Sequence, residues 1–159
     1  MRITRVLAGS AAVIAAAAGV GLAVAGPASA GQPSGDPSGT WRAFGNTVPT
    51  TASLSTWSCA PSHQIGVSVV AQVCVVISPD KLSIQPAVIV RNDKPVEYDA
   101  TAFMQLVQDS PPGPVFGYNC PQSGVASHSW SVCFGNTVGN FGGAFARGTA
   151  GNDVSLGMT

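Results

Sequence analysis

An alternation of apolar residues in the middle of the chain constrains the fold more than any other feature of the sequence. A period of two places every second side chain of an extended strand on the same face. Such a strand buries that face on a hydrophobic core. The segment therefore predicts a long central strand, or two strands joined by a bend. The alternating residues are Ile65, Val67, Val69, Ala71, Val73, Val75 and Ile77.

The rest of the chain predicts further short strands separated by turn residues. Residues 101–108 fit a helical face as well as an alternating strand, and their strand-like neighbours favour a strand. Pro86 cannot donate a ladder hydrogen bond, which predicts an edge position or a bulge. Short strands without an amphipathic helix for a βαβ crossover predict an all-β fold, an antiparallel β-sandwich that is immunoglobulin-like in general architecture. The further strand candidates are residues 40–46, 54–60, 82–90, 115–120, 127–135 and 142–148.

The first thirty residues have the pattern of a secretory signal peptide. Arg2 and Arg5 precede an uncharged apolar run, and Ala28-Ser29-Ala30 supplies the small residues that signal peptidase requires. An uncleaved membrane anchor is the alternative, since about 20 apolar residues can span a bilayer. The many small residues of the run favour cleavage after Ala30. We therefore expect a secreted protein, extracellular or cell-wall associated, with no membrane contact after cleavage.

Composition divides the remainder into one domain and two tails. Residues 31–39 contain only small polar residues, glycine and proline, and predict a flexible N-terminal tail. Residues 40–148 contain the strand candidates and are expected to form the β-sandwich domain. Residues 149–159 are expected to form a polar C-terminal tail that frays.

Four cysteines lie at positions 59, 74, 120 and 133. An even number in an exported domain predicts disulfides. Three pairings are possible, and Cys59–Cys74 with Cys120–Cys133 is favoured because each closes a short loop between consecutive strand-like segments. A tetrahedral zinc site is the alternative, but it needs closely spaced cysteine pairs that this chain lacks. We expect neither a metal nor a cofactor.

The charge balance bears on the class of partner. The whole chain carries seven basic and seven acidic residues. Loss of Arg2 and Arg5 with the signal peptide leaves a net charge of −2. The chain has no basic patch, so nucleic-acid binding and attraction to anionic lipid have no support.

Exposed aromatic side chains are candidates for binding in a secreted β-domain. Trp41, Tyr118 and Trp130 are the candidate platform for a glycan, a cell-wall component or an extracellular protein. Packing in the core and at its rim is the alternative role. Trp57 lies two residues before Cys59, so both side chains share a face, and we expect Trp57 to pack on a disulfide as in immunoglobulin-type cores.

No catalytic residue is predicted. The two histidines, His63 and His128, have no nucleophile motif beside them. The only acidic cluster surrounds Lys94 and matches no calcium-binding loop, so it is expected to be a solvated turn. It consists of Asp93, Glu97 and Asp99.

Two further sequence features bear on function. Residues 109–116 form a proline-rich loop, and rigid loops of this kind serve secreted protease inhibitors. The pentapeptide Phe-Gly-Asn-Thr-Val occurs at both 44–48 and 134–138. We interpret it as two similar turns after strands that end in an aromatic residue, because the flanking residues do not repeat.

The chain resembles small secreted two-disulfide proteins of actinomycete-type bacteria. The resemblance lies in the Ala28-Ser29-Ala30 site, in Trp57-Ser58-Cys59 with Cys74, and in Trp130 with Cys133. The chain does not match the subtilisin inhibitors of these bacteria, so no reactive-site residue is carried over. The resemblance assigns no activity. The absence of a catalytic motif and the candidate aromatic residues lead us to expect a secreted, non-enzymatic domain that binds a glycan, a cell-wall component or a protein. Protease inhibition through residues 109–116 is the first alternative, and a small secreted hydrolase is the second.

Overall fold

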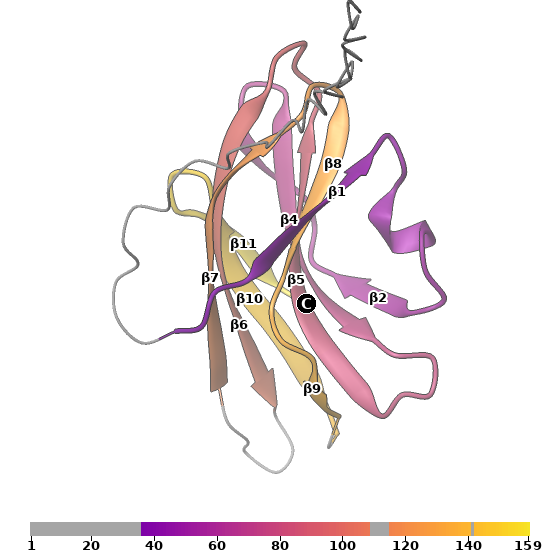
Figure 1. Cartoon of the computed structure of the whole chain (residues 1–159). Coiled ribbons are helices and arrows are strands. Elements are labelled where there is room, and N and C mark those ends of the chain that lie inside the picture. The colour runs from indigo at the N-terminus through magenta and orange to yellow at the C-terminus, as the bar shows by residue number, and fades with distance from the viewer. Residues whose placement is uncertain (1–35, 109–114, 141) are drawn as a thin grey trace, which may run out of the picture.

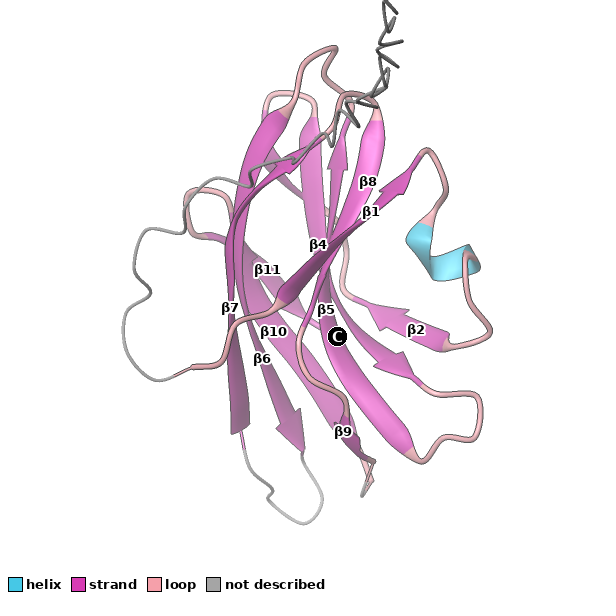
Figure 2. Ribbon diagram, in the orientation of Figure 1, coloured by secondary structure: helices cyan, strands magenta, loops and turns pink. Residues whose placement is uncertain are grey.

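The computed structural model describes residues 36–108, 115–140 and 142–159 (Figure 1). The predicted signal peptide, residues 31–35 of the predicted tail and residues 109–114 of the proline-rich loop lie outside these ranges. The described residues form strands and one 3-10 helix, which Figure 2 distinguishes by colour. The elements are β1 (Thr40–Gly45), η1 (Pro49–Thr51), β2 (Thr56–Cys59), β3 (His63–Gly66), β4 (Val69–Ile77), β5 (Ser83–Asn92), β6 (Tyr98–Gln108), β7 (Val115–Val125), β8 (Ser129–Phe134), β9 (Val138–Gly139), β10 (Ala144–Ala150) and β11 (Val154–Met158).

The strands build two antiparallel sheets that pack face to face, which confirms the predicted all-β sandwich. One sheet has the order β1-β8-β5-β4-β2, with β3 paired to β4 and β9 paired to β5. The other sheet has the order β11-β10-β6-β7. The two layers enclose the main hydrophobic core.

The alternating segment supplies the centre of this core. Val69 and Val73 of β4 are fully buried and face Met104 of β6 and other residues of the second sheet. Val67, which the period of two placed on the same face, is 79% exposed instead. It lies in a tight turn between β3 and β4, so the segment is a hairpin of two strands. The predicted bend is confirmed, and the single long strand is wrong.

Pro86 does not lie in an edge strand, so the predicted edge position is wrong. β5 is central, with β4 on one side and β8 and β9 on the other. The carbonyl of Pro86 accepts a hydrogen bond from Gly135 N at 2.9 Å, at the interruption between β8 and β9. Proline lacks an N–H donor, and this donor is missing at the point where the neighbouring strand is interrupted. The sheet therefore loses few hydrogen bonds.

Residues 101–108 lie within β6, so the prediction of a strand is confirmed. The segment alternates between the buried Ala102, Met104 and Leu106 and the outward-facing residues between them.

The domain extends beyond both predicted boundaries. The predicted C-terminal tail is wrong, because β11 pairs with β10 and Leu156 is fully buried in the core. At the other end, Gly39 N donates to Asn119 O at 2.7 Å, and Ser38 forms a bridge with the same residue of β7. The predicted flexible tail therefore does not reach Gly39.

Both predicted disulfides are present. Cys59 and Cys74 are directly opposite each other in the β2–β4 ladder, whereas Cys120 and Cys133 join β7 to β8 and so connect the two sheets. No cysteine in the described part of the chain is free. Two disulfides indicate an oxidising compartment. No helix among the described residues has the length and hydrophobicity needed to cross a membrane.

Candidate functional site

The seven-stranded sheet carries a second apolar cluster on the face that points away from the main core. We call it the outer cluster. It arises because the residues of β4, β5 and β8 that alternate with the core residues are also apolar. A sheet that is apolar on both faces requires a cover on each side. The outer cluster consists of Cys74, Val76, Ala87, Ile89 and Val132, with Phe44, Trp57, Cys59, Trp130 and Phe134 packed against them.

Residues 46–55 approach one end of the outer cluster. This segment connects β1 to β2 and contains η1, and it stands beside β1 and β8 in Figure 1. Pro49 at the start of η1 is buried, which anchors the segment. Leu54 in the same segment is 91% exposed. The segment therefore covers part of the cluster and leaves a hollow beside it.

The hollow is a pocket of about 330 Å³ between this segment and the sheet. This volume lies at the lower end of the range of roughly 300–1,000 Å³ found for small-molecule pockets. The sheet supplies aromatic side chains and two long polar ones, and the segment supplies hydroxyl groups from Ser53 and Ser55. The main lining residues from the sheet are Arg42, Phe44, Trp57, Gln85 and Phe134.

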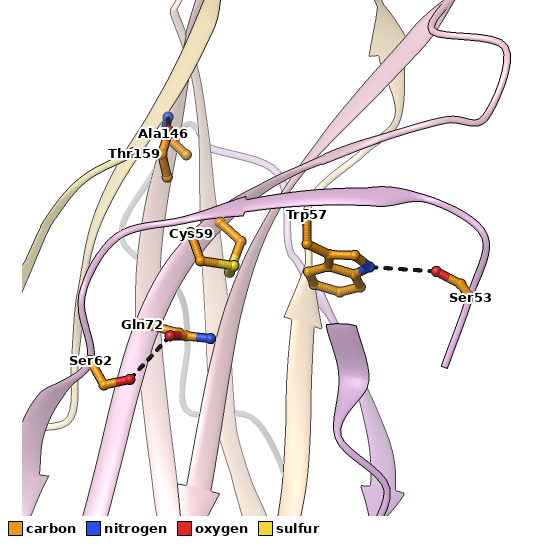
Figure 3. Close-up of a disulfide and its surroundings, with 8 residues drawn as sticks. Ser53, Trp57, Cys59, Ser62, Gln72, Ala146 and Thr159 are labelled. Carbon is orange, nitrogen blue, oxygen red and sulfur yellow. Dashed lines mark hydrogen bonds between the residues drawn. A yellow bond between two sulfur atoms is a disulfide. The ribbon is translucent and has the colours of Figure 1, made fainter. Parts of the chain in front are cut away.

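Phe134, at the end of β8, is the centre of the aromatic wall. Its ring centroid lies 6.4 Å from that of Phe44 in a tilted arrangement and 6.0 Å from that of Trp57 in an edge-to-face arrangement. Both geometries are favourable for aromatic pairs. The indole N–H of Trp57 donates to Ser53 Oγ at 3.4 Å (Figure 3). This bond ties the covering segment to β2 and fixes one side of the pocket.

Two polar side chains of the sheet complete the pocket. The Arg42 guanidinium lies over the Phe134 ring, 5.7 Å from its centroid. Gln85 donates its amide N–H to Gly135 O at 2.7 Å, which orients the amide and leaves its oxygen as an acceptor. No carboxylate is among the residues that line the pocket. The arrangement offers fixed hydrogen-bond donors and acceptors beside an aromatic wall.

The structure places the three predicted binding residues on different surfaces. Trp130 belongs to the outer cluster but does not line the pocket. Its ring is covered by the Arg91 guanidinium at 5.2 Å, and Arg91 in turn pairs with Asp93 at 2.6 Å. Trp130 therefore supports the sheet surface next to the pocket.

Trp41 faces the main core. Its indole N–H donates to Pro121 O at 2.6 Å, and it is opposite Cys133 in the β1–β8 ladder. Trp41 thus packs where the inter-sheet disulfide lies, the place expected for Trp57. Trp57 and Cys59 do share a face, as predicted, but that face is the outer one. The two tryptophans exchange the expected roles because the register of β1 turns Trp41 inward and Arg42 outward.

Tyr118 is only 2% exposed and lies between the sheets, so it presents no surface to a ligand. The side chains of β7 alternate, and Tyr118 is on the inner face with Cys120. Desolvation by burial raises the pKa of the Tyr118 hydroxyl, and a hydrogen bond with the Asn136 backbone opposes this shift only in part. Trp41 and Tyr118 therefore do not form a platform with Trp130.

Alkaline pH is expected to destabilise the domain through Tyr118. Its pKa is raised above 10.0 by burial, so the unfolded chain loses this proton at a lower pH than the folded domain does. The stabilising contribution is fully present below about pH 10 and is lost as pH rises through the folded pKa. Urea unfolding from about pH 9 to 12 should show this loss in the wild type and a smaller one in Tyr118→Phe. If the free energy of unfolding fell equally with pH in the wild type and in Tyr118→Phe, the assignment of this loss to Tyr118 would be contradicted.

The remaining sequence candidates lie away from the pocket. Neither His63 nor His128 is among the residues that line it. His128 has a positive φ of 50° and lies in the turn that precedes β8. Asp93, Glu97 and Asp99 are all exposed, as predicted for solvated residues. Asp93 and Glu97 lie in the connection between β5 and β6, as predicted, but Asp99 belongs to β6.

A second hollow lies on the outer face of the four-stranded sheet, next to the irregularity between β10 and β11. It has a volume of about 370 Å³ and is more open. Its charged side chain, Arg147, already donates to Gln105 Oε1 at 2.8 Å. This hollow is therefore the weaker candidate.

The sequence interpretation missed Arg42, Phe44 and Phe134 as site residues. The repeated pentapeptide contained the relevant signal, because both of its phenylalanines reach the pocket from the ends of β1 and β8. Both phenylalanines lie at or next to the end of a strand, as predicted, but the two turns are not similar. Asn46 lies in a turn, whereas residues 135–137 lead without a turn into β9. Phe44 and Phe134 come together because β1 pairs with β8, and the repeat alone does not specify that pairing.

Comparison with known proteins gives no match to a family model, to a curated protein or to a solved structure. The geometry of the pocket therefore carries the functional argument.

Proposed function

We propose that the chain is a secreted, non-enzymatic domain that binds a saccharide unit of a glycan or cell-wall polymer in the pocket on the outer face of the seven-stranded sheet. The observation that carries this proposal is the combination of an aromatic wall with fixed polar groups. A sugar ring has apolar C–H faces and a rim of hydroxyl groups. Aromatic side chains and convergent donors and acceptors are what such a molecule needs from a binding site.

The composition of the pocket supports binding rather than chemistry. Its lining residues include neither a histidine nor a carboxylate, and a hydrolase would require such groups near the scissile bond. The two disulfides support an extracellular location, together with the predicted signal peptide.

A protein partner is the second candidate, and the exposed apolar residues beside the pocket favour it. Leu54 and Val48 lie on the covering segment, with 91% and 42% of their surface exposed. Exposed apolar side chains next to a hollow are common at protein interfaces. Such a contact would use the rim of the pocket, whereas a saccharide would use its interior.

Retention on insoluble polysaccharides and isolated cell walls tests the proposal. The protein beginning at Gly31 should be retained on at least one matrix, and Phe44→Ala should lower retention about tenfold through loss of one aromatic contact. Trp130→Ala is the matched control, because it removes an aromatic residue of the same face that does not line the pocket. Its retention should equal that of the wild type.

Two results would contradict the proposal. One is no retention of the wild type on any matrix. The other is a loss with Trp130→Ala together with normal retention of Phe44→Ala. If the ligand is a protein, Leu54→Ser should weaken binding of that protein and leave retention on the saccharide matrices unchanged.

A further inference from the structure

We infer that the saccharide bound in the pocket carries a carboxylate, which the Arg42 guanidinium receives. This inference rests on the proposed function and names the chemical class of its ligand. Arg42 is the one charged residue among the described residues that line the pocket. A ligand group that reaches Arg42 therefore meets a positive charge that no acidic residue of the lining neutralises.

Comparison with Arg91 shows why Arg42 is available to a ligand. Both guanidiniums cover an aromatic ring of β8, Arg42 that of Phe134 and Arg91 that of Trp130. Arg91 also pairs with Asp93 at 2.6 Å and donates to His128 O at 3.0 Å. Arg42 has no ion-pair partner among the residues that the structure describes. Arg91 is thus held by an ion pair and a hydrogen bond as well as by its ring contact, whereas Arg42 is held by its ring contact.

The chemistry of the guanidinium selects a carboxylate. It is planar, and its N–H donors point outward from the edge of the plane. A ring below the plane holds the group by a cation–π contact without using those donors. A carboxylate can accept two parallel N–H bonds from such an edge, and these charged bonds are roughly twice as strong as neutral ones.

The other polar groups of the pocket suit the rest of a sugar. The Gln85 amide oxygen and the serine hydroxyls on the covering segment can bond to hydroxyl groups. The aromatic wall can cover the apolar face of the ring. The pocket therefore matches a sugar acid in its parts, with the acid group assigned to Arg42.

Carboxylated sugars have two extracellular sources that this chemistry does not separate. Uronic acids carry the carboxylate on the sugar ring, and muramic acid carries it on a lactyl ether. Matched pairs distinguish the two sources. N-acetylmuramic acid is compared with N-acetylglucosamine, which lacks only the lactyl group, and galacturonic acid is compared with galactose, which has a hydroxymethyl group in place of the carboxylate.

Isothermal titration of the protein beginning at Gly31 with each pair tests the inference. At low ionic strength, at least one acidic member should bind about tenfold more tightly than its neutral counterpart, and the preference should shrink as salt screens the charge. Arg42→Gln should remove the preference and leave the weak binding of the neutral sugar. Phe44→Ala should weaken both members of the pair.

Arg147→Gln is the control for charge, because it makes the same change in net charge on the outer face of the other sheet. It should leave the preference unchanged. Equal binding of acidic and neutral members would overturn the inference and leave the proposed function standing. Absence of binding to every member of both pairs would overturn the inference, and retention on the insoluble matrices then decides the proposed function separately. If Arg147→Gln lost the preference for the acidic sugar as fully as Arg42→Gln, the preference would be a nonspecific charge effect, and the inference would also be overturned.

Discussion

Replacing Asn92 by alanine is expected to lower the free energy of unfolding by on the order of 3 kcal/mol, because it leaves several buried backbone groups without partners. Asn92 is the last residue of β5 and is fully buried. Its side-chain nitrogen donates to the carbonyls of Val96 at 2.8 Å, Val125 at 2.9 Å and Ala126 at 3.1 Å. Its oxygen accepts from Lys94 N at 3.0 Å.

These bonds connect the two sheets at one end of the sandwich. β5 belongs to the seven-stranded sheet, whereas the accepting carbonyls of Val125 and Ala126 lie at the end of β7 in the four-stranded sheet and just beyond it. Each buried group that loses its partner costs about 1–3 kcal/mol, and a water molecule that enters the cavity and bonds to the group recovers part of that cost. Asn92→Asp is expected to be at least as harmful, since a carboxylate cannot donate to three carbonyls.

Urea unfolding measures this effect as a lower midpoint at unchanged slope. Asn140→Ala is the matched control, because the Asn140 side chain also donates to a carbonyl, that of Lys81 at 2.9 Å, but at an exposed site. Water can replace that bond, so the cost should stay below about 1 kcal/mol. Similar costs for Asn92→Ala and Asn140→Ala would show that burial of the Asn92 bonds contributes little.

Removal of the inter-sheet disulfide by the double substitution Cys120→Ala and Cys133→Ala is expected to cost about 4 kcal/mol. The loop between these cysteines spans 13 residues, and its release alone accounts for roughly 3 kcal/mol in the chain-entropy model. The remainder comes from packing, because both sulfurs lie in the main core. A Cβ on Gly39 would approach Cys133 Sγ to 2.5 Å, which shows how closely the chain surrounds this disulfide.

The other disulfide provides the comparison. Cys59–Cys74 closes a loop of similar length, but it joins adjacent strands of one sheet on the outer face. Its replacement by two alanines should cost less, about 3 kcal/mol, since the loop entropy is similar but the packing loss is smaller. Cys74 is fully buried in the outer cluster, whereas Cys59 is only half-buried. Thermal or urea unfolding of the two double variants ranks them directly. A larger cost for the Cys59–Cys74 pair would contradict the packing contribution assigned to the inter-sheet bond.

Local patterns in the sequence were sufficient to predict the fold class and the disulfides. The period of two in β4 follows from burial of one strand face, and it is readable without knowing the partner strands. Cys59–Cys74 joins strands that are adjacent in one sheet, and Cys120–Cys133 joins strands that follow each other along the chain, so short spacing was a valid guide in both cases.

Features that depend on pairing between distant strands were not predictable in this way. The sequence predicts a binding role for Trp41 and a packing role for Trp57. The register of β1 on β8 instead turns Trp41 toward the core, and the register of β2 on β4 places Trp57 on the outer face. β11 was missed because its apolar alternation is short and only partly buried. Leu156 is fully buried and Val154 packs against the core, whereas Met158 is 60% exposed.

The candidate site was predictable only in its chemical type. An aromatic-containing face was expected, and the pocket is aromatic. Of the three named residues, Trp130 alone lies on that face, while Phe44 and Phe134 supply the wall. The wall forms because β1 and β8 are paired, and the covering segment must fold back over their ends. Neither condition is encoded in a local pattern.

The three indole N–H signals in a ¹H–¹⁵N spectrum give the most direct test of the pocket on the outer face. Each tryptophan reports a different place: Trp57 lines the pocket, Trp130 lies beside it, and Trp41 donates to Pro121 O toward the main core. On addition of the acidic sugar that binds most tightly, the Trp57 signal should shift progressively and the Trp41 signal should stay in place. A shift of the Trp41 signal with an unmoved Trp57 signal would contradict the account.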